Sequence, residues 1–124
     1  MIYGIGVDIV EVSRIKSCIE KWGDHFLGKI FLQDEIDYCK IKKNPYPHAA
    51  ARFAAKESVF KAMGSLPYLI GWKDIEIRKE ESGKPFLVFS SSLKDYLAKY
   101  NNFSCHLSIS HTEEYAVAQV IVEI

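Results

Sequence analysis

The chain has 124 residues, which is enough for one domain with a substantial core and too few for two. Apolar residues make up 48% and charged residues 26%, as in ordinary globular proteins. The 16 basic and 16 acidic residues balance, and no run is apolar enough to span a bilayer, so neither a nucleic-acid binder nor a membrane protein is expected. The 3 cysteines form no CxxC pair, which favours a reduced, cytoplasmic location over a disulfide scaffold or a zinc site. The start of the chain has no signal-peptide pattern.

The first expected element is a strand over Ile2–Val10. Apolar residues alternate in it with Gly4, Gly6 and Asp8. Two of these three positions have no side chain, so another backbone or a ligand can come close to the Asp8 carboxylate.

Helices are expected to dominate the next fifty residues. Ser13 is the predicted cap of a short helix that Gly23 ends, and Gln33–Lys42 reads as a second helix. The segment Asn44–Pro47 then breaks the chain before a long helix over His48–Met63.

The second half of the chain is expected to be mostly strands. Two hairpins are predicted, over 72–78 with 85–89 and over 103–110 with 115–122, and they flank a helix over 90–100 with a capping box at Ser92 and Asp95. The last strand is almost entirely apolar and should be central in its sheet. The fold class is therefore α+β, with helices packed on an antiparallel-rich sheet.

The long helix carries a charge at an unexpected position. At about 100° per residue, Phe53 and Phe60 fall roughly 20° apart and define a buried stripe, and Glu57 lies only about 40° from Phe53. A carboxylate on such a stripe needs a partner, a metal or a substrate. A salt bridge with Lys61, one turn later, is the ordinary alternative.

The candidate chemistry rests on Asp8, Glu57 and Lys61. The chain has no glycine-rich phosphate loop and no GxSxG elbow. Two hard carboxylates with open coordination positions suit Mg²⁺, which commonly completes its shell with water and phosphate oxygens. A lysine beside them can neutralise charge on a transferring phosphorus group.

Two further features are compatible with phosphate binding. Basic residues, among them Arg52, outnumber Glu57 by six to one between Lys40 and Lys61, which suits a phosphorylated ligand or an acidic partner, although a solvated surface explains it equally well. His111, at the end of a predicted strand, is either a structural residue or a phosphate contact at the edge of the site.

Several segments, taken together, resemble the holo-[acyl-carrier-protein] synthase family, the short bacterial class of 4′-phosphopantetheinyl transferases. They are GIGVDIV at 4–10, RFAAKE at 52–57, WKDIEI at 72–77, GKP at 83–85 and SISHT at 108–112. The resemblance implies one phosphopantetheinyl transferase domain over 1–124. It also implies transfer of the phosphopantetheine arm of coenzyme A to a serine of apo acyl carrier protein, with release of adenosine 3′,5′-bisphosphate, in support of fatty acid biosynthesis.

The resemblance also implies roles for individual residues. Asp8 and Glu57 would bind Mg²⁺ with the coenzyme A pyrophosphate, and Lys61, Arg52 and His111 would contact its phosphates. Together Asp8, Glu57 and Lys61 form the expected catalytic set. The family further implies a homotrimer with sites between subunits.

Docking of the acidic carrier protein is expected on the first helix, through Arg14, Lys16 and Lys21. The chain departs from the family pattern at Ser65-Leu66, where a glycine-rich turn is common, and at Phe31-Leu32, where a threonine often caps the next helix. Two alternatives remain open: a metal-dependent phosphohydrolase that uses the same carboxylates, and a non-catalytic carrier-binding module.

Overall fold

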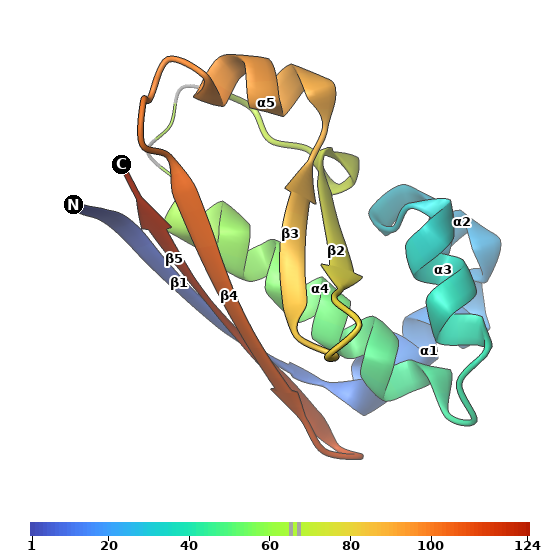
Figure 1. Cartoon of the computed structure of the whole chain (residues 1–124). Coiled ribbons are helices and arrows are strands. Elements are labelled where there is room, and N and C mark those ends of the chain that lie inside the picture. The colour runs from blue at the N-terminus through green and yellow to red at the C-terminus, as the bar shows by residue number, and fades with distance from the viewer. Residues whose placement is uncertain (65, 67) are drawn as a thin grey trace.

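The structure is a computed structural model that describes residues 1–64, 66 and 68–124. Within these residues, two antiparallel sheets of strand order β1-β5-β4 and β2-β3 are combined with helices (Figure 1). The elements in chain order are β1 (Ile2–Glu11), α1 (Val12–Trp22), α2 (Asp24–Ile30), α3 (Gln33–Lys40), α4 (Pro45–Ala62), the short 3₁₀ helix η1 (Trp72–Asp74), β2 (Ile75–Lys79), β3 (Pro85–Phe89), α5 (Ser91–Leu97), β4 (Ser104–His111) and β5 (Tyr115–Glu123). The predicted α+β class and both hairpins are confirmed, and the apolar strand β5 is central in its sheet.

Helix α4 packs against one face of the three-stranded sheet, and two glycines of β1 allow a very close approach. A Cβ atom at Gly4 would overlap the carbonyl oxygen of Ala62, and one at Gly6 would overlap that of Ser58. The Ser58 hydroxyl also donates to the carbonyl of Ala118 on β5, at 3.1 Å. The two glycines predicted to share a face with Asp8 therefore allow the backbone of α4 to contact β1.

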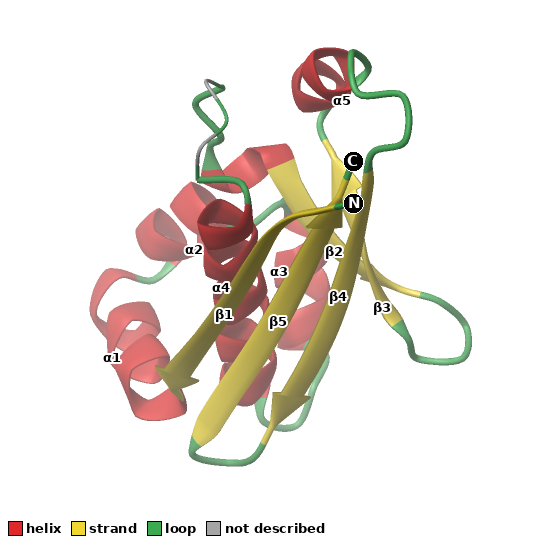
Figure 2. Ribbon diagram, turned by 90° about the vertical axis from the view of Figure 1, so that its left-hand side faces the viewer, coloured by secondary structure: helices red, strands yellow, loops and turns green. Residues whose placement is uncertain are grey.

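The opposite face of this sheet is open (Figure 2). Ile5, Val7 and Ile9 of β1 alternate with the glycine face and are 57%, 55% and 67% exposed. Val117, on the neighbouring strand β5, is 36% exposed. A sheet face of this kind, with aliphatic side chains in water, is typical of a surface that associates with another protein.

The buried charges of α4 are Lys56 and Arg52 and not Glu57, which corrects the sequence-based expectation. Glu57, Phe53 and Phe60 are only partly buried, while small residues such as Ala54 and Ala55 form the innermost face. The helix lies so close to the sheet that alanines, rather than phenylalanines, fill the contact. Both phenylalanine rings instead lie beside Trp72, with ring centroids 5.2 and 4.8 Å away.

Lys56 is completely buried and fully bonded. Its ammonium donates to Glu35 Oε1 at 2.7 Å and to the carbonyls of Ile30 at 2.8 Å and Trp72 at 3.1 Å. The other oxygen of Glu35 accepts the Ile77 amide at 3.0 Å. Through these contacts, the Lys56–Glu35 pair connects α4 to α2, α3, η1 and β2.

Several helix boundaries differ from the sequence-based prediction. Helix α2 was not predicted, because its seven residues carry no clear apolar period and it follows directly on the turn at Gly23. Helix α4 begins at Pro45, since proline is well tolerated in the first turn, where an amide donor is not needed. Strand β2 begins at Ile75 and not at Trp72, because residues 72–74 form a 3₁₀ turn.

The helix caps also differ. Ser90, rather than Ser92, caps α5 by accepting the Leu93 amide at 3.2 Å, and Ser13 lies inside α1. At the start of α3, the Leu32 amide donates to Glu35 Oε1 at 3.0 Å, so a carboxylate secures the helix entry in the absence of a threonine. The substitution noted at Ser65 lies outside the described residues. No helix in the described part of the chain is long and apolar enough to cross a bilayer.

Candidate active site

Asp8, Glu57 and Lys61 are brought together where β1 meets α4. The Lys61 ammonium lies 3.1 Å from Asp8 Oδ1 and donates to the Val7 carbonyl at 2.9 Å. The Asp8 side chain is 17% exposed and that of Lys61 is 52% exposed. Glu57 lies one turn before Lys61 on the same helix. The three residues singled out from the sequence thus converge at an accessible edge.

The electrostatics of this cluster leave a surplus of negative charge. Burial raises the pKa of the Glu57 carboxyl, the charge of Asp8 raises it further, and Lys61 only partly opposes them. Two carboxylates therefore share one exposed ammonium. Such a donor set fits Mg²⁺, which binds hard oxygens and often takes only one or two protein carboxylates. Among the described residues, no group of three His, Cys, Asp or Glu side chains offers a closed metal site.

A second cluster, of basic residues, lines a cavity of about 270 Å³. Arg52 and His111 both contribute to it, and so do His48 and Lys79, whereas none of the described lining residues is acidic. Arg52 is only 3% exposed, and within the described part of the chain its buried Nε has no hydrogen-bond partner. A buried guanidinium with a spare donor beside other bases fits an anionic ligand.

The two clusters lie on opposite sides of α4. Arg52 and Lys61 are nine residues apart, so at about 100° per residue they project roughly 180° from one another. Consistently, Lys61 reaches β1, whereas Arg52 lies near α3 and β2. The phosphate-binding residues predicted from sequence are therefore divided: Lys61 lies with the carboxylates, and Arg52 lies with His111.

His48 of the basic cavity was not predicted as a site residue. Its ring centroid lies 5.1 Å from that of His111. Burial, and then the neighbouring charges of His111, Lys42, Arg52 and Lys79, lower the pKa of His48 to about 4. The sequence around His48, just after a proline at the start of a helix, does not indicate that His48 lies in a basic cavity beside His111.

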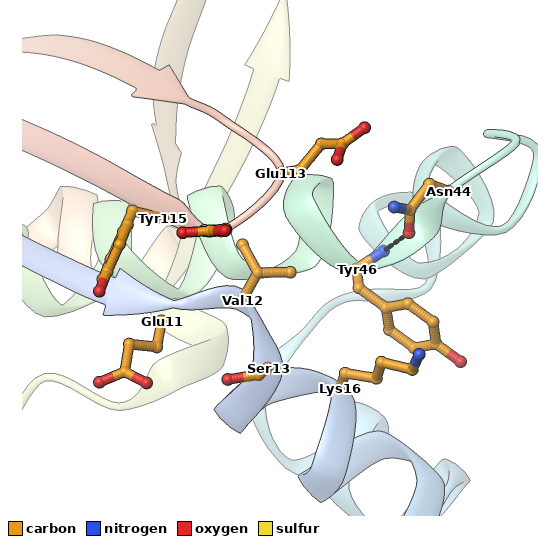
Figure 3. Close-up of a pocket in the computed structure, with 9 residues that line it drawn as sticks. Glu11, Val12, Ser13, Lys16, Asn44, Tyr46, Glu113 and Tyr115 are labelled. Carbon is orange, nitrogen blue, oxygen red and sulfur yellow. Dashed lines mark hydrogen bonds between the residues drawn. The ribbon is translucent and has the colours of Figure 1, made fainter.

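The predicted docking residues Arg14, Lys16 and Lys21 are all exposed on α1. Lys16 lies 5.4 Å from the centre of the Tyr46 ring and lines a cavity of about 660 Å³ (Figure 3). The same cavity is lined by three carboxylates, those of Glu11, Glu113 and Glu114. The surface beside Lys16 is therefore of mixed charge and not uniformly basic.

Comparison with known proteins places these features in a family. The model of the 4′-phosphopantetheinyl transferase superfamily matches residues 4–120. The chain belongs to this superfamily. A holo-[acyl-carrier-protein] synthase of Halothermothrix orenii is 47% identical over 99% of this chain and 98% of the relative. One from Clostridium kluyveri is 45% identical over all of this chain and 92% of its own length.

Solved structures of this superfamily share the fold. A holo-[acyl-carrier-protein] synthase from Neisseria meningitidis superposes with a TM-score of 0.90 at 34% identity, and both chains are covered completely. One from Helicobacter pylori, in complex with coenzyme A, gives a TM-score of 0.81 at 32% identity over 96% of this chain and 99% of its own. One from Bacillus anthracis, in complex with coenzyme A (3′,5′-ADP), gives 0.80 at 38% identity over 98% of this chain and 96% of its own.

Proposed function

We propose that this chain is a cytoplasmic holo-[acyl-carrier-protein] synthase. It transfers the 4′-phosphopantetheine group of coenzyme A to a serine of apo acyl carrier protein, releases adenosine 3′,5′-bisphosphate, and so supports fatty acid biosynthesis. The observation that carries the proposal is the convergence of Asp8, Glu57 and Lys61 at one accessible edge. The relatives named as holo-[acyl-carrier-protein] synthases, two of them in complex with coenzyme A, support it.

Asp8 and Glu57 are the proposed ligands of Mg²⁺ in this reaction. A bound Mg²⁺ would supply positive charge against the phosphate oxygens of coenzyme A. Lys61 adds a second cation beside the pyrophosphate, where charge develops. The carrier serine hydroxyl loses its proton to water, and its oxygen forms a bond to the phosphorus that carries the pantetheine arm as the bond from this phosphorus to the bridging oxygen breaks. The leaving oxygen departs with adenosine 3′,5′-bisphosphate.

The remaining phosphate of coenzyme A is assigned to the basic cavity of Arg52 and His111. This cavity lies across α4 from the carboxylates, so one chain does not present both clusters to one ligand. A neighbouring copy of the chain can complete the site, because its basic cavity can face the carboxylates of the first chain. The open aliphatic face around Val7 supports such self-association. We therefore propose a homotrimer with each site shared by two subunits.

The activity is tested by incubating the protein with apo acyl carrier protein, coenzyme A and Mg²⁺ and weighing the carrier by mass spectrometry. We expect the carrier to gain one phosphopantetheine group. Loss of coenzyme A in a control without carrier would indicate a phosphohydrolase instead. Binding of the carrier without modification, unaffected by Glu57→Ala, would indicate a non-catalytic module.

The shared site is tested by mixing two impaired variants, Glu57→Ala and His111→Ala, under conditions that exchange subunits and at a coenzyme A concentration too low for His111→Ala alone to be active. If sites are shared, about a quarter of the interfaces in a random equimolar mixture combine an intact Glu57 with an intact His111, and activity returns. No activity returns if each site lies within one chain, because every chain then carries a defect. Val7→Lys, on the open sheet face, should give monomers in light scattering.

A further inference from the structure

Tyr38 gathers three basic side chains from three different segments. Its ring centre lies 4.0 Å from the Arg52 guanidinium of α4, 4.6 Å from the Lys42 ammonium after α3, and 5.4 Å from the Lys79 ammonium at the end of β2. The Tyr38 ring also forms a T-shaped contact with the His48 ring, with centroids 5.9 Å apart. Aromatic faces attract cations, so one ring can hold several of them in place.

This gathering of charge is unfavourable unless an anion compensates it. Burial alone would raise the pKa of the Tyr38 hydroxyl, but a hydrogen bond with Lys79 and the charges of Lys79, Arg52 and Lys42 outweigh burial and lower it. Like charges held together repel one another and favour binding of an anion.

The carboxylates nearest to these cations lie outside the basic cavity. Asp34 and Glu76 line an adjoining hollow of about 250 Å³, to which Tyr38, Arg52 and Lys79 also contribute. Glu76 is already engaged by Arg78, with contacts of 2.9 and 3.1 Å. The basic cavity itself remains without a carboxylate among its described lining residues.

We propose that Tyr38 is a positioning residue that holds Lys79 and Arg52 against the ribose 3′-phosphate of coenzyme A, and that Lys79 binds this phosphate directly. The inference rests on the proposed function. The pyrophosphate belongs with Asp8 and Glu57, where the transfer occurs, which leaves the 3′-phosphate as the remaining anionic group. A phosphomonoester carries close to two negative charges and accepts several charge-assisted hydrogen bonds, so it suits more than one cation.

The experiment compares coenzyme A with 3′-dephospho-coenzyme A in steady-state transfer. Tyr38→Leu removes the ring, Tyr38→Phe keeps the ring but loses the hydroxyl, and Lys79→Met removes the ammonium. Lys94→Met, on the exposed surface of α5, is the matched control. We expect Tyr38→Leu and Lys79→Met to raise KM for coenzyme A about 10-fold, with kcat and the KM for the dephospho substrate unchanged. Tyr38→Phe should be intermediate, and Lys94→Met should match the wild type.

A role of Tyr38 in stability alone would impair both substrates equally, and that result would overturn the proposal. A second readout separates this outcome from failure of the proposed function. Calorimetry measures binding of adenosine 3′,5′-bisphosphate and of adenosine 5′-phosphate without any carrier protein. The wild type should prefer the bisphosphate, and Tyr38→Leu should lose most of that preference. An unchanged preference in Tyr38→Leu and Lys79→Met contradicts the inference, whether or not the protein modifies a carrier.

Discussion

Lys56 and Glu57 are neighbours on α4, yet the protein treats their charges in opposite ways. Lys56 is fully buried, and its three donors meet Glu35 and two backbone carbonyls. Glu57 lies at an accessible edge beside a second carboxylate, Asp8, which helps to raise its pKa. One charge is completely satisfied within the chain, and the other is not.

The difference separates a structural ion pair from a binding site. A buried pair with all its hydrogen bonds made fixes the segments that it joins, and removing one partner is costly. Carboxylates left close together at a surface cost stability, and here one exposed ammonium, that of Lys61, offsets their charge only in part. On this reasoning, the Lys56–Glu35 pair supports the fold, and Asp8 with Glu57 serves the reaction.

The largest effect is expected for Asp8→Ala and Glu57→Ala. Each should lower kcat/KM for transfer by about 10³-fold or more, because the ligands that hold positive charge at the reacting phosphate are lost. The fold should persist, since both residues lie at an edge. EDTA should abolish activity reversibly. Glu81→Ala, in the exposed β2–β3 turn, is the matched control and should be unaffected.

Removing the charge of Glu57 should raise the thermal stability of the protein, and the gain should depend on pH. Because the folded pKa of Glu57 is raised, native protein binds this proton more tightly than unfolded protein, and the resulting stabilisation is lost as pH rises through the folded pKa. Glu57→Gln should therefore raise Tm at pH 7 and have less effect below about pH 4. Mg²⁺ should raise the Tm of the wild type more than that of the variant. An equal response to Mg²⁺ would contradict metal binding by Glu57.

The opposite pattern is expected for Lys56→Met. Unfolding in urea should show a loss of about 3–5 kcal/mol, because Glu35 is left as an unpaired buried carboxylate. Adding Glu35→Gln should recover part of the loss, since the amide oxygen still accepts the Ile77 amide without a charge. Lys73→Met, on an exposed side chain, is the control and should change stability little. A loss no larger than that of the control would mean that the pair contributes nothing to the fold.

Patterns along single elements were predictable from the sequence, and contacts between elements were not. Period-two alternation correctly placed Asp8 on the glycine face of β1, and the almost entirely apolar sequence of β5 correctly predicted its central place in the sheet. The prediction that Phe53 and Phe60 form the buried stripe of α4 was wrong. Only small side chains fit where the helix lies closest to the sheet, and the phenylalanines lie to one side. Asp8 and Glu57 could be proposed as a pair, and the resemblance pointed to Arg52 and His111. Their grouping with His48 and Lys79 in one cavity could not be predicted, because the cavity combines residues from α4, β2 and β4.

Lys61 shares features with both the structural ion pair and the binding site, since it pairs with Asp8 and is also exposed. If its role is catalytic, Lys61→Ala should lower kcat/KM by about 10²-fold through lost charge stabilisation. Lys61→Met keeps the aliphatic stem and should be impaired about equally. Steady-state kinetics and thermal unfolding should be measured together. Normal turnover by Lys61→Met would return Lys61 to a purely structural pairing with Asp8.

The smallest effect is expected at the α1 surface, which is assigned to carrier docking and not to coenzyme A binding or transfer. Arg14→Glu should raise the apparent KM for carrier protein several-fold and change that for coenzyme A little, because charge complementarity with an acidic partner mainly governs encounter. Added salt should weaken use of the carrier in the wild type and less so in the variant, since screening removes the same attraction. Lys16→Glu should have a weaker effect than Arg14→Glu, because Glu11, Glu113 and Glu114 already offset the charge beside it. If Arg14→Glu raised the KM for coenzyme A as strongly as that for the carrier, Arg14 would belong to the nucleotide site, and the docking surface would have to be sought on another element.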